Sequence, residues 1–143
     1  MNARHATSKD LTRLVMLGRE LHSSSDAAWL PFSPATFRKS LQAMLRRPEM
    51  AVLVSEKDGE LTGLLLGAID QVLWGRALYA TDLEFGAKAG GDELMEAFKA
   101  WATERGCKVL YMGVSNSGRE KAKDKFFEKH GASRKGGLYE VRL

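Results

Sequence analysis

The segment Leu83–Gly91 is rich in glycine and alanine and lies between a predicted strand and a predicted helix. Small residues let the backbone approach a ligand closely, and the start of a helix presents unpaired N–H groups at the positive end of its dipole. Together these features favour the binding of phosphate groups, to which Lys88 would add a positive charge. The alternative is an ordinary strand-to-helix connection, in which glycine serves only to turn the chain.

Standard signatures of other phosphate sites and of metal sites do not accompany this segment. The patterns G-x-x-x-x-G-K-[S/T] and G-x-G-x-x-G are both absent from the sequence. The single cysteine, Cys107, precludes an internal disulfide, and no spacing of cysteine and histidine predicts a zinc site, so we expect no metal. We interpret Cys107 as a small core residue at the beginning of a strand.

Length and charge limit the classes of protein to which the chain can belong. Its 143 residues suffice for one domain, predicted over residues 1–143. No apolar run approaches the roughly 20 residues of a membrane span and the N-terminus lacks a signal-peptide core, so we expect a soluble cytoplasmic protein. The net charge of +4 permits an anionic ligand. Basic residues gather in the last quarter, but no aromatic stacking motif or recognition helix accompanies them, which argues against nucleic acid as a partner.

Periodicity and capping residues predict four helices and five strands. The helices are expected over residues 8–23, from residue 34 to a stop at Pro48, and over residues 92–105 and 119–130. The strands are expected over residues 50–55, 61–73, 77–82, 109–114 and 138–143, with Asp58-Gly59 turning the chain between the first two. The order α-α-β-β-β-α-β-α-β places antiparallel strands first and then a crossover that makes a parallel pair. The expected fold class is therefore α/β (α+β), with a mixed, mostly antiparallel sheet flanked by helices.

Several stretches together fit the pattern of a known family. Leu83–Gly91 aligns without gaps with P-E-Y-R-G-K-G-I-G, residues 97–107 resemble a stretch ending in W-A-x-x-x-G, and residues 126–132 resemble F-Y-E-K-x-G-F. Asn116 resembles an asparagine that follows the family's central strand. With the order of the elements, these stretches resemble the GNAT acyltransferases over about residues 11–143. Leu30–Pro34 resembles a stretch of small members often carried by phages.

The resemblance implies that the parallel strands splay apart around a cosubstrate, acetyl-CoA. Its pyrophosphate would meet the N–H groups of the loop, namely those of Lys88, Ala89, Gly90, Gly91 and Asp92. Its pantetheine arm would pair with the third strand near Thr81 and Leu83, and Asn116 and Phe127 would also border the coenzyme. The acceptor would be a primary amine on a small molecule or a protein, entering between the first two helices and the sheet. The sequence is compatible with a homodimer.

The resemblance also implies a base for the attacking amine and an acid for the leaving thiolate. Asp82 and Glu84 are the candidate bases, and the alternative is that both are solvated loop carboxylates. Phe127 stands where the family often has a tyrosine that protonates the thiolate, and a phenyl ring has no proton to donate. Water or Tyr139 would then take that role, while Tyr79 is a further candidate or a half-buried strand residue.

Two more departures make the pyrophosphate-loop motif degenerate. Gly86 occupies the position of the motif's arginine, and Ala89 replaces one of its glycines. Two hypotheses therefore stand beside each other. The first is an N-acetyltransferase that moves an acetyl group from acetyl-CoA to a primary amine. The second is a catalytically inactive protein of the same fold, including one encoded by a phage, that acts in binding or assembly.

Overall fold

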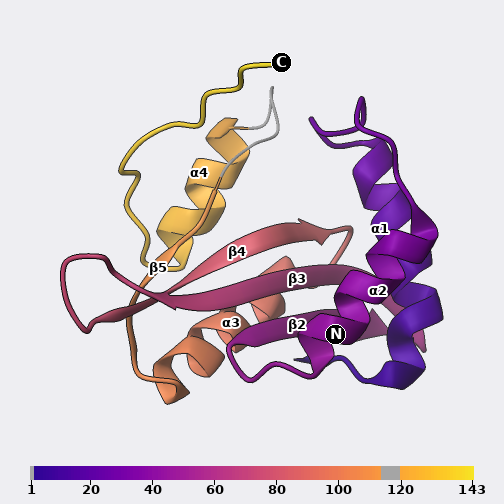
Figure 1. The fold of residues 1–143 in the computed structure, drawn as a ribbon, viewed down its shortest axis with the longest axis horizontal. Coiled ribbons are helices and arrows are strands. Elements are labelled where there is room, and N and C mark those ends of the chain that lie inside the picture. Colours follow the sequence, from indigo (N-terminus) through magenta and orange to yellow (C-terminus); the bar gives the residue numbers. More distant parts are fainter. Residues whose placement is uncertain (1, 114–119) are drawn as a thin grey trace.

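The computed structural model describes residues 2–113 and 120–143 (Figure 1). Its strands are β1 (Asn2–His5), β2 (Met50–Lys57), β3 (Glu60–Gln71), β4 (Leu78–Ala87) and β5 (Cys107–Tyr111). Its helices are α1 (Leu11–Ser23), which follows a 3-10 turn (Ser8–Asp10), α2 (Pro34–Leu45), α3 (Gly91–Glu104) and α4 (Glu120–Lys129). Among the described residues, none of the helices has the length and apolar character needed to cross a membrane.

One mixed sheet organises the fold, with its strands in the order β1-β2-β3-β4-β5. All neighbouring strands are antiparallel except β4 and β5, which are parallel. The parallel pair is connected through α3, as a crossover requires. The fold class expected from the sequence, α+β with a mixed sheet and one parallel pair, is therefore confirmed.

Helices cover both faces of the sheet, so the inner strands bury side chains on both sides. One cluster joins α1 and α2 to alternate strand residues and contains Leu14, Leu41, Val52, Val54, Leu64 and Leu66. The other joins α3 to the intervening strand residues and contains Leu53, Leu65, Ala80, Leu94, Phe98 and Trp101. This two-sided burial explains why β2 is apolar at consecutive positions from Met50 to Val54 instead of at every second one.

Local signals in the sequence set several boundaries of these elements. Thr7 caps the 3-10 turn that leads into α1, and the Asp10 carboxylate accepts a hydrogen bond from the Thr7 N–H, which completes a capping box. Ser33 caps α2 through its hydroxyl. Asp58 and Gly59 have φ angles of 53° and 81°, as the tight turn between β2 and β3 requires. These predicted starts and turns are confirmed.

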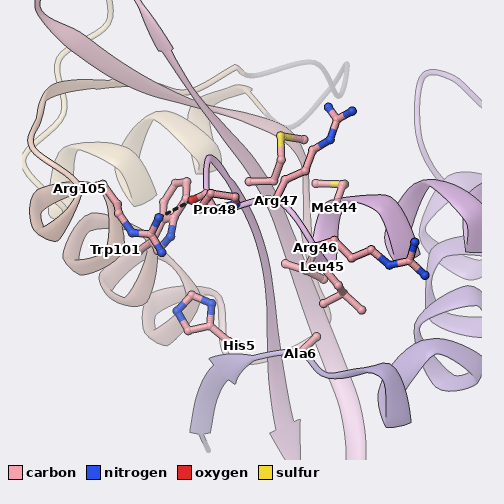
Figure 2. A pocket seen from close by; sticks show the side chains of 11 residues that line it. His5, Ala6, Met44, Leu45, Arg46, Arg47, Pro48, Trp101 and Arg105 are labelled. Atoms are coloured by element: carbon pink, nitrogen blue, oxygen red, sulfur yellow. Dashed lines mark hydrogen bonds between the residues drawn. The ribbon is translucent and has the colours of Figure 1, made fainter.

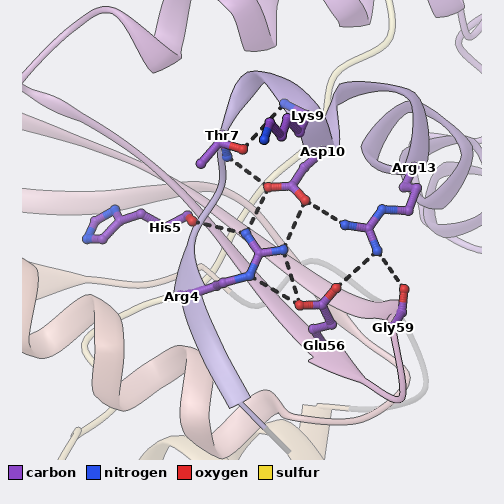
Figure 3. A network of polar contacts seen from close by, with 8 residues as sticks. All are labelled: Arg4, His5, Thr7, Lys9, Asp10, Arg13, Glu56 and Gly59. Atoms are coloured by element: carbon purple, nitrogen blue, oxygen red, sulfur yellow. Dashed lines mark hydrogen bonds and ion pairs between the residues drawn. The ribbon is translucent and has the colours of Figure 1, made fainter.

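A network of charged side chains fastens β1 to α1 and β2 (Figure 3). The Asp10 carboxylate accepts hydrogen bonds from Arg4 at 2.8 and 2.9 Å and from Arg13 at 2.7 Å. Glu56 of β2 lies 3.2 Å from Arg4 and 3.0 Å from Arg13. The Asp10 side chain is only 3% exposed, and the hydrogen bonds from Arg4 hold its pKa well below the usual range.

Two expectations about strands at the ends of the chain are wrong. Alternation in residues 138–143 predicts a strand, but residues 132–143 contain no helix or strand, and Leu138 and Val141 are exposed. Conversely, Asn2–His5 was not expected to be a strand, although it pairs with β2 along its whole length. Alternation records a local preference, whereas a strand also needs a neighbour with which to form hydrogen bonds.

Candidate functional site

β4 and β5 are paired over only part of their length and then diverge (Figure 1). The parallel pairing runs from Leu78 and Cys107 to Thr81 and Tyr111, where β5 ends. β4 continues to Ala87 while paired with β3 on its other side, so residues 83–87 form a strand and not the expected loop. Within the described part of the chain, the edge of β4 beyond Thr81 therefore has no strand partner. Such an edge offers backbone N–H and C=O groups to a ligand.

A β-bulge at Leu83 changes the direction of the side chains that follow it. Asp82 pairs with Gly67 and Glu84 pairs with Leu66, so Leu83 is the extra residue. Directly paired residues share a face of the sheet. Gly67 lies against α3, whereas Leu66 packs in the cluster under α1 and α2. Asp82 and Glu84 therefore point to opposite faces, although in a regular strand their spacing would place them on the same face.

The two carboxylates also differ in what surrounds them. Asp82 Oδ1 accepts a hydrogen bond from the N–H of Gly113 at 3.0 Å, just beyond the end of β5. Burial raises the pKa of Asp82 against the effect of this hydrogen bond. Desolvation by nearby protein raises the pKa of Glu84, reinforced by the charge of Asp82 and opposed by His22 and Lys123. A raised pKa makes a carboxylate a better base near neutral pH.

The first turn of α3 presents its N–H groups without a side-chain cap. Gly90, which precedes the helix, has a φ of 85°, a left-handed conformation suited to glycine. The carbonyl oxygen of Ala89 accepts hydrogen bonds from the hydroxyls of Ser55 at 2.9 Å and Thr62 at 3.0 Å. The N–H of Lys88 donates to the Thr62 carbonyl at 2.8 Å. These bonds hold the loop against β2 and β3, and among the described residues no side chain caps the N–H groups that begin α3.

Lys88 and Asp92, two of the charged side chains around this turn, are paired with residues of other elements. Lys88 Nζ lies 2.9 and 3.0 Å from the carboxylate oxygens of Glu20 in α1. Asp92, in the first turn of α3, contacts Lys129 at 2.9 Å and His130 at 2.8 Å. Hydrogen bonds from Lys129 and then His130 lower the pKa of Asp92. Two groups from the end of α4 thus compensate the carboxylate beside the uncapped N–H groups.

Phe126 of α4 borders the same turn. Its ring centroid lies 5.8 Å from that of Phe85 in β4, and a Cβ at Gly91 would lie 3.6 Å from its ring. Phe127, which the sequence singles out, packs against Phe126 with 5.4 Å between ring centroids. Because Phe126 comes closest to the backbone of the turn, it is the aromatic side chain that shapes this side of the site.

The opposite face of β4 meets α1 and the loop that precedes α2. A Cβ at Gly86 would lie 3.0 Å from Leu21, so the position aligned with the family's arginine points toward α1. The rings of His22 and Phe32 lie 5.4 Å apart, and the Arg19 guanidinium lies 5.7 Å from the centroid of Phe32. This side of β4 therefore combines aromatic and basic side chains with Glu84, whose pKa His22 influences.

Other sequence-predicted residues are not brought to this place. Tyr139 lies in the C-terminal segment that forms no strand, with 93% of its surface exposed. Tyr79 lies where β4 is still paired, with its ring 5.7 Å from that of Tyr111. Asn116 lies outside the described residues. Conversely, no role could be assigned to His130 from the sequence, because its contact with Asp92 joins residues 38 positions apart and leaves no local pattern.

A metal centre and a cavity elsewhere in the fold are the alternatives to this turn as a site. In residues 2–113 and 120–143, no group of three or more His, Cys, Asp or Glu side chains is placed to hold a metal. A cavity of about 360 Å³ lies near the opposite end of α3, between Trp101, Arg105, His5 and Leu45 (Figure 2). The Arg105 guanidinium donates to the carbonyl of Pro48 at its edge. This cavity is separate from the turn at the start of α3.

Comparisons with known proteins bear on the same stretch of chain. The model of the acetyltransferase (GNAT) family matches residues 17–132, which include β4, the loop and α3. No curated protein matches the chain.

Solved structures share the fold at low sequence identity. A transcriptional regulator from Bacillus halodurans C-125 superposes with a TM-score of 0.81 at 18% identity, covering 99% of each chain. A probable acetyltransferase has a TM-score of 0.79 at 19% identity, covering 100% of this chain and 97% of its own. A ribosomal-protein-alanine N-acetyltransferase from Brucella melitensis biovar Abortus 2308 has a TM-score of 0.73 at 14% identity, covering 99% of this chain and 98% of its own. These likenesses concern the fold alone.

Proposed function

Because the chain belongs to the acetyltransferase (GNAT) family, we propose that it transfers an acetyl group from acetyl-CoA to a primary amine. The observation that carries this proposal is the uncapped first turn of α3, which lies beside the part of β4 that β5 leaves unpaired. The N–H groups of the turn suit a diphosphate, and the unpaired backbone of β4 suits the amide groups of an extended ligand. One coenzyme molecule that carries a diphosphate and amides could therefore use both. Attraction of the diphosphate to this turn does not require an arginine in the loop, since the N–H groups and the dipole of α3 supply it.

Backbone groups would make most of the contacts with the coenzyme. The N–H groups of Ala89, Gly90, Gly91 and Asp92 would donate to the diphosphate. The N–H of Lys88 already donates to Thr62, so Lys88 would contribute only the charge of its side chain. The backbone of β4 from Thr81 to Leu83 would pair with the pantetheine arm, and Phe126 and Phe127 would border it.

We assign the role of base to Glu84. It lies on the face of β4 that α1 and α2 cover, where an acceptor would approach between these helices and the sheet, and its pKa is raised. Asp82 points to the other face and holds the N–H of Gly113, which suits a positioning role. Glu84 would take a proton from the ammonium group, directly or through water.

The remaining steps follow from the chemistry of a thioester. The neutral amine attacks the acetyl carbonyl carbon while N–H groups of β4 polarise the oxygen, and the new C–N bond replaces the C–S bond. The leaving thiolate would take a proton from water, because Phe127 has none to give and Tyr139 lies in the exposed C-terminal segment away from the site. The products are an N-acetylated amine and free coenzyme A.

The acceptor would be an amine on a small molecule or a protein. His22, Phe32 and Arg19 border the side from which it would approach, so the acceptor would meet both aromatic and basic groups. One structural neighbour is named for acetylating the alanine of a ribosomal protein. We place the activity in the cytoplasm, where acetyl-CoA is available to a transferase.

Thermal shift with a matched pair of glycine variants tests the cofactor site. Gly91→Glu puts a negative charge and bulk into the first turn of α3, whereas Gly136→Glu makes the same change in open space within the C-terminal segment. Acetyl-CoA at about 1 mM should raise the melting temperature of the wild type and Gly136→Glu by a few degrees, and that of Gly91→Glu far less. Release of free coenzyme A with a panel of polyamines and peptides then measures turnover.

Three results would contradict the proposal in different ways. If acetyl-CoA leaves the melting temperature of the wild type unchanged, acetyl-CoA is not the cosubstrate. An equal shift in Gly91→Glu would place the coenzyme elsewhere on the molecule. A normal shift without coenzyme A release from any amine would favour the inactive binding or assembly protein.

A further inference from the structure

A cavity of about 360 Å³ lies where the end of α3 faces the turn between α2 and β2 (Figure 2). Its volume is within the range of about 300 to 1,000 Å³ that small-molecule sites occupy. The end of β1 borders it, since His5 and Ala6 are part of its lining. The 14 residues of α3, at about 1.5 Å per residue, separate it by roughly 20 Å from the turn proposed for the coenzyme.

The inner surface of this cavity is apolar and well supported. Trp101, whose side chain forms part of the wall, stacks on Phe98 in the core with 5.7 Å between the ring centroids. An apolar group that enters the cavity would therefore leave water for a wall that is already in place. Six buried or half-buried apolar side chains form this wall, namely Ala6, Met44, Leu45, Met50, Val52 and Trp101.

The rim of the cavity carries positive charge. Arg46, Arg47 and Arg105 line it, and in the described part of the chain none of the lining residues is acidic. Arg4 and Arg13 form ion pairs with carboxylates, but in residues 2–113 and 120–143 none of the three arginines at the cavity does. The charge at this rim therefore favours an anionic ligand.

Arg105 is the arginine that is held at the mouth of the cavity. One of its N–H groups donates to the carbonyl oxygen of Pro48, and its guanidinium lies 5.9 Å from the centroid of the Trp101 ring. This one bond occupies only part of a planar donor set that matches a carboxylate. In Figure 2 Arg105 turns toward Trp101 and Pro48, whereas Arg46 and Arg47 extend outward from the turn after α2. Arg105 can thus pair with an anion, to which Arg46 and Arg47 add the field of their charge.

We propose that this cavity binds a small aromatic carboxylate, at a site separate from that of the coenzyme. The ring of the ligand lies against the apolar wall, and its carboxylate pairs with Arg105 at the mouth. An inorganic anion would leave the apolar wall in contact with water, and an uncharged ring would give Arg105 no charged acceptor. A carboxylate attached to a ring satisfies both parts of the cavity.

NMR titration of the isotope-labelled full chain with three matched probes tests the chemistry of the ligand. Phenylacetate carries a ring and a carboxylate, phenylacetamide has nearly the same shape without the charge, and acetate has the charge without the ring. We expect phenylacetate to bind with a Kd on the order of 1 mM, as suits so small a ligand. Phenylacetamide should bind about tenfold more weakly, because a charge-assisted hydrogen bond is lost, and acetate should not bind measurably.

The tryptophans report where the probe binds. Trp101 is buried, whereas Trp29 and Trp74 are 49% and 92% exposed, so Trp29→Phe and Trp74→Phe assign the three indole N–H signals with little risk to the fold. Phenylacetate should move the signal of Trp101 and leave the other two in place. The inference is overturned if the Trp101 signal stays unchanged up to about 20 mM phenylacetate, a concentration well above the expected Kd. A shift confined to Trp29 or Trp74 overturns it as well.

A pair of arginine variants tests the anchor. Arg105→Gln removes the charge at the mouth, and Arg76→Gln makes the same change in the exposed turn between β3 and β4 as a control. Arg105→Gln should bind phenylacetate about tenfold more weakly and phenylacetamide nearly as before, while Arg76→Gln should match the wild type. Equal affinity of the two variants for phenylacetate contradicts the role of Arg105. If Arg105→Gln does not fold, equal affinity of the wild type for phenylacetate and phenylacetamide is the result that refutes the site.

The coenzyme provides a test of separateness. The Kd of phenylacetate should stay the same when acetyl-CoA is present at about 1 mM, because the two ligands occupy opposite ends of α3. Loss of phenylacetate binding under these conditions would place the probe in the coenzyme site and overturn the inference. If acetyl-CoA does not bind at all, the proposed function fails, and the cavity is judged from the phenylacetate titrations alone.

Discussion

Asp82 and Glu84 carry the same functional group, and their surroundings decide what each can do. Asp82 accepts a hydrogen bond from the backbone beyond β5, whereas Glu84 lies on the side of β4 that faces α1 and α2. The sequence supplied both residues as candidates through the family resemblance. It could not distinguish them, because an alternating strand would point both to the same face and no residue type marks the bulge at Leu83.

Replacing Glu84 by glutamine should remove the base. We expect Glu84→Gln to lower kcat about 100-fold, the usual size of a general-base contribution, with little change in the Kd of acetyl-CoA. A base works only when ionised, so wild-type activity should be present above the pKa of Glu84 and be lost as the pH falls through it. Because that pKa is raised, the loss should begin at a higher pH than for an ordinary glutamate. Initial rates between about pH 5 and 8 measure this.

Two companion variants make this prediction specific. Glu60→Gln changes an exposed glutamate at the start of β3 and should leave the rate unchanged. Asp82→Asn keeps an oxygen that can accept the hydrogen bond from Gly113. A rate lowered more by Asp82→Asn than by Glu84→Gln would identify Asp82 as the base.

At the scale of elements, the loop before α3 depends on a close approach between neighbouring strands. A Cβ at Gly63 of β3 would lie 2.7 Å from both Ala87 Cβ and Ser55 Oγ. Ser55 Oγ is one of the two hydroxyl oxygens that hold the Ala89 carbonyl. The absence of a side chain at Gly63 therefore allows the loop to reach its anchors.

Gly63→Ala should consequently affect both folding and the site. The added methyl overpacks a buried position, and we expect about 2 kcal/mol less unfolding free energy, together with a weaker thermal shift by acetyl-CoA. Gly67→Ala crowds Phe98 of α3 farther along the same face of β3 and should cost stability without weakening binding per folded molecule. Gly75→Ala adds a methyl in open space and should do neither. Urea denaturation and calorimetry separate the two effects, and equal binding by Gly63→Ala and Gly67→Ala would refute the role of the anchor.

Elements were predictable from the sequence where their signals are local. Capping by Thr7 and Ser33 and the turn at Asp58-Gly59 involve residues next to one another, and the corresponding boundaries are confirmed. β1 and residues 138–143 depend on partners far away in the chain, and both were misjudged. The same distinction explains why the glycine-rich loop was recognised while its anchors, Ser55 and Thr62, were not.

At the scale of the whole molecule, the network around Asp10 joins the first strand to the rest of the fold. Arg4 belongs to β1, Arg13 to α1 and Glu56 to β2, and all three meet at or beside the same carboxylate (Figure 3). β1 is an edge strand of only four residues. Its attachment therefore relies on these charged hydrogen bonds as well as on its pairing with β2.

Asp10→Asn should lower the unfolding free energy by about 2 kcal/mol at neutral pH, since hydrogen bonds to charged groups are lost. The folded-state pKa of Asp10 is depressed, so its contribution is complete above the ordinary pKa of about 4 and is lost as the pH falls through the folded value. The difference from the wild type should accordingly shrink in acid. Urea denaturation at about pH 7 and about pH 3 tests this. Glu104→Gln on the exposed end of α3 is the control, and a difference that grows in acid would contradict the argument.

Leu83, the single extra residue in β4, reverses the alternation of side chains between the two faces of the sheet. Downstream of Leu83 the side chains face opposite to what uninterrupted alternation would give, so Phe85 packs in the cluster beside α3 while Glu84 faces α1 and α2. Deleting Leu83 would remove the bulge and leave Glu84 opposite Leu66 and Phe85 opposite Leu65, so both side chains would keep their faces. Deleting a residue after the bulge would instead move the remaining side chains of β4 to the opposite faces of the sheet.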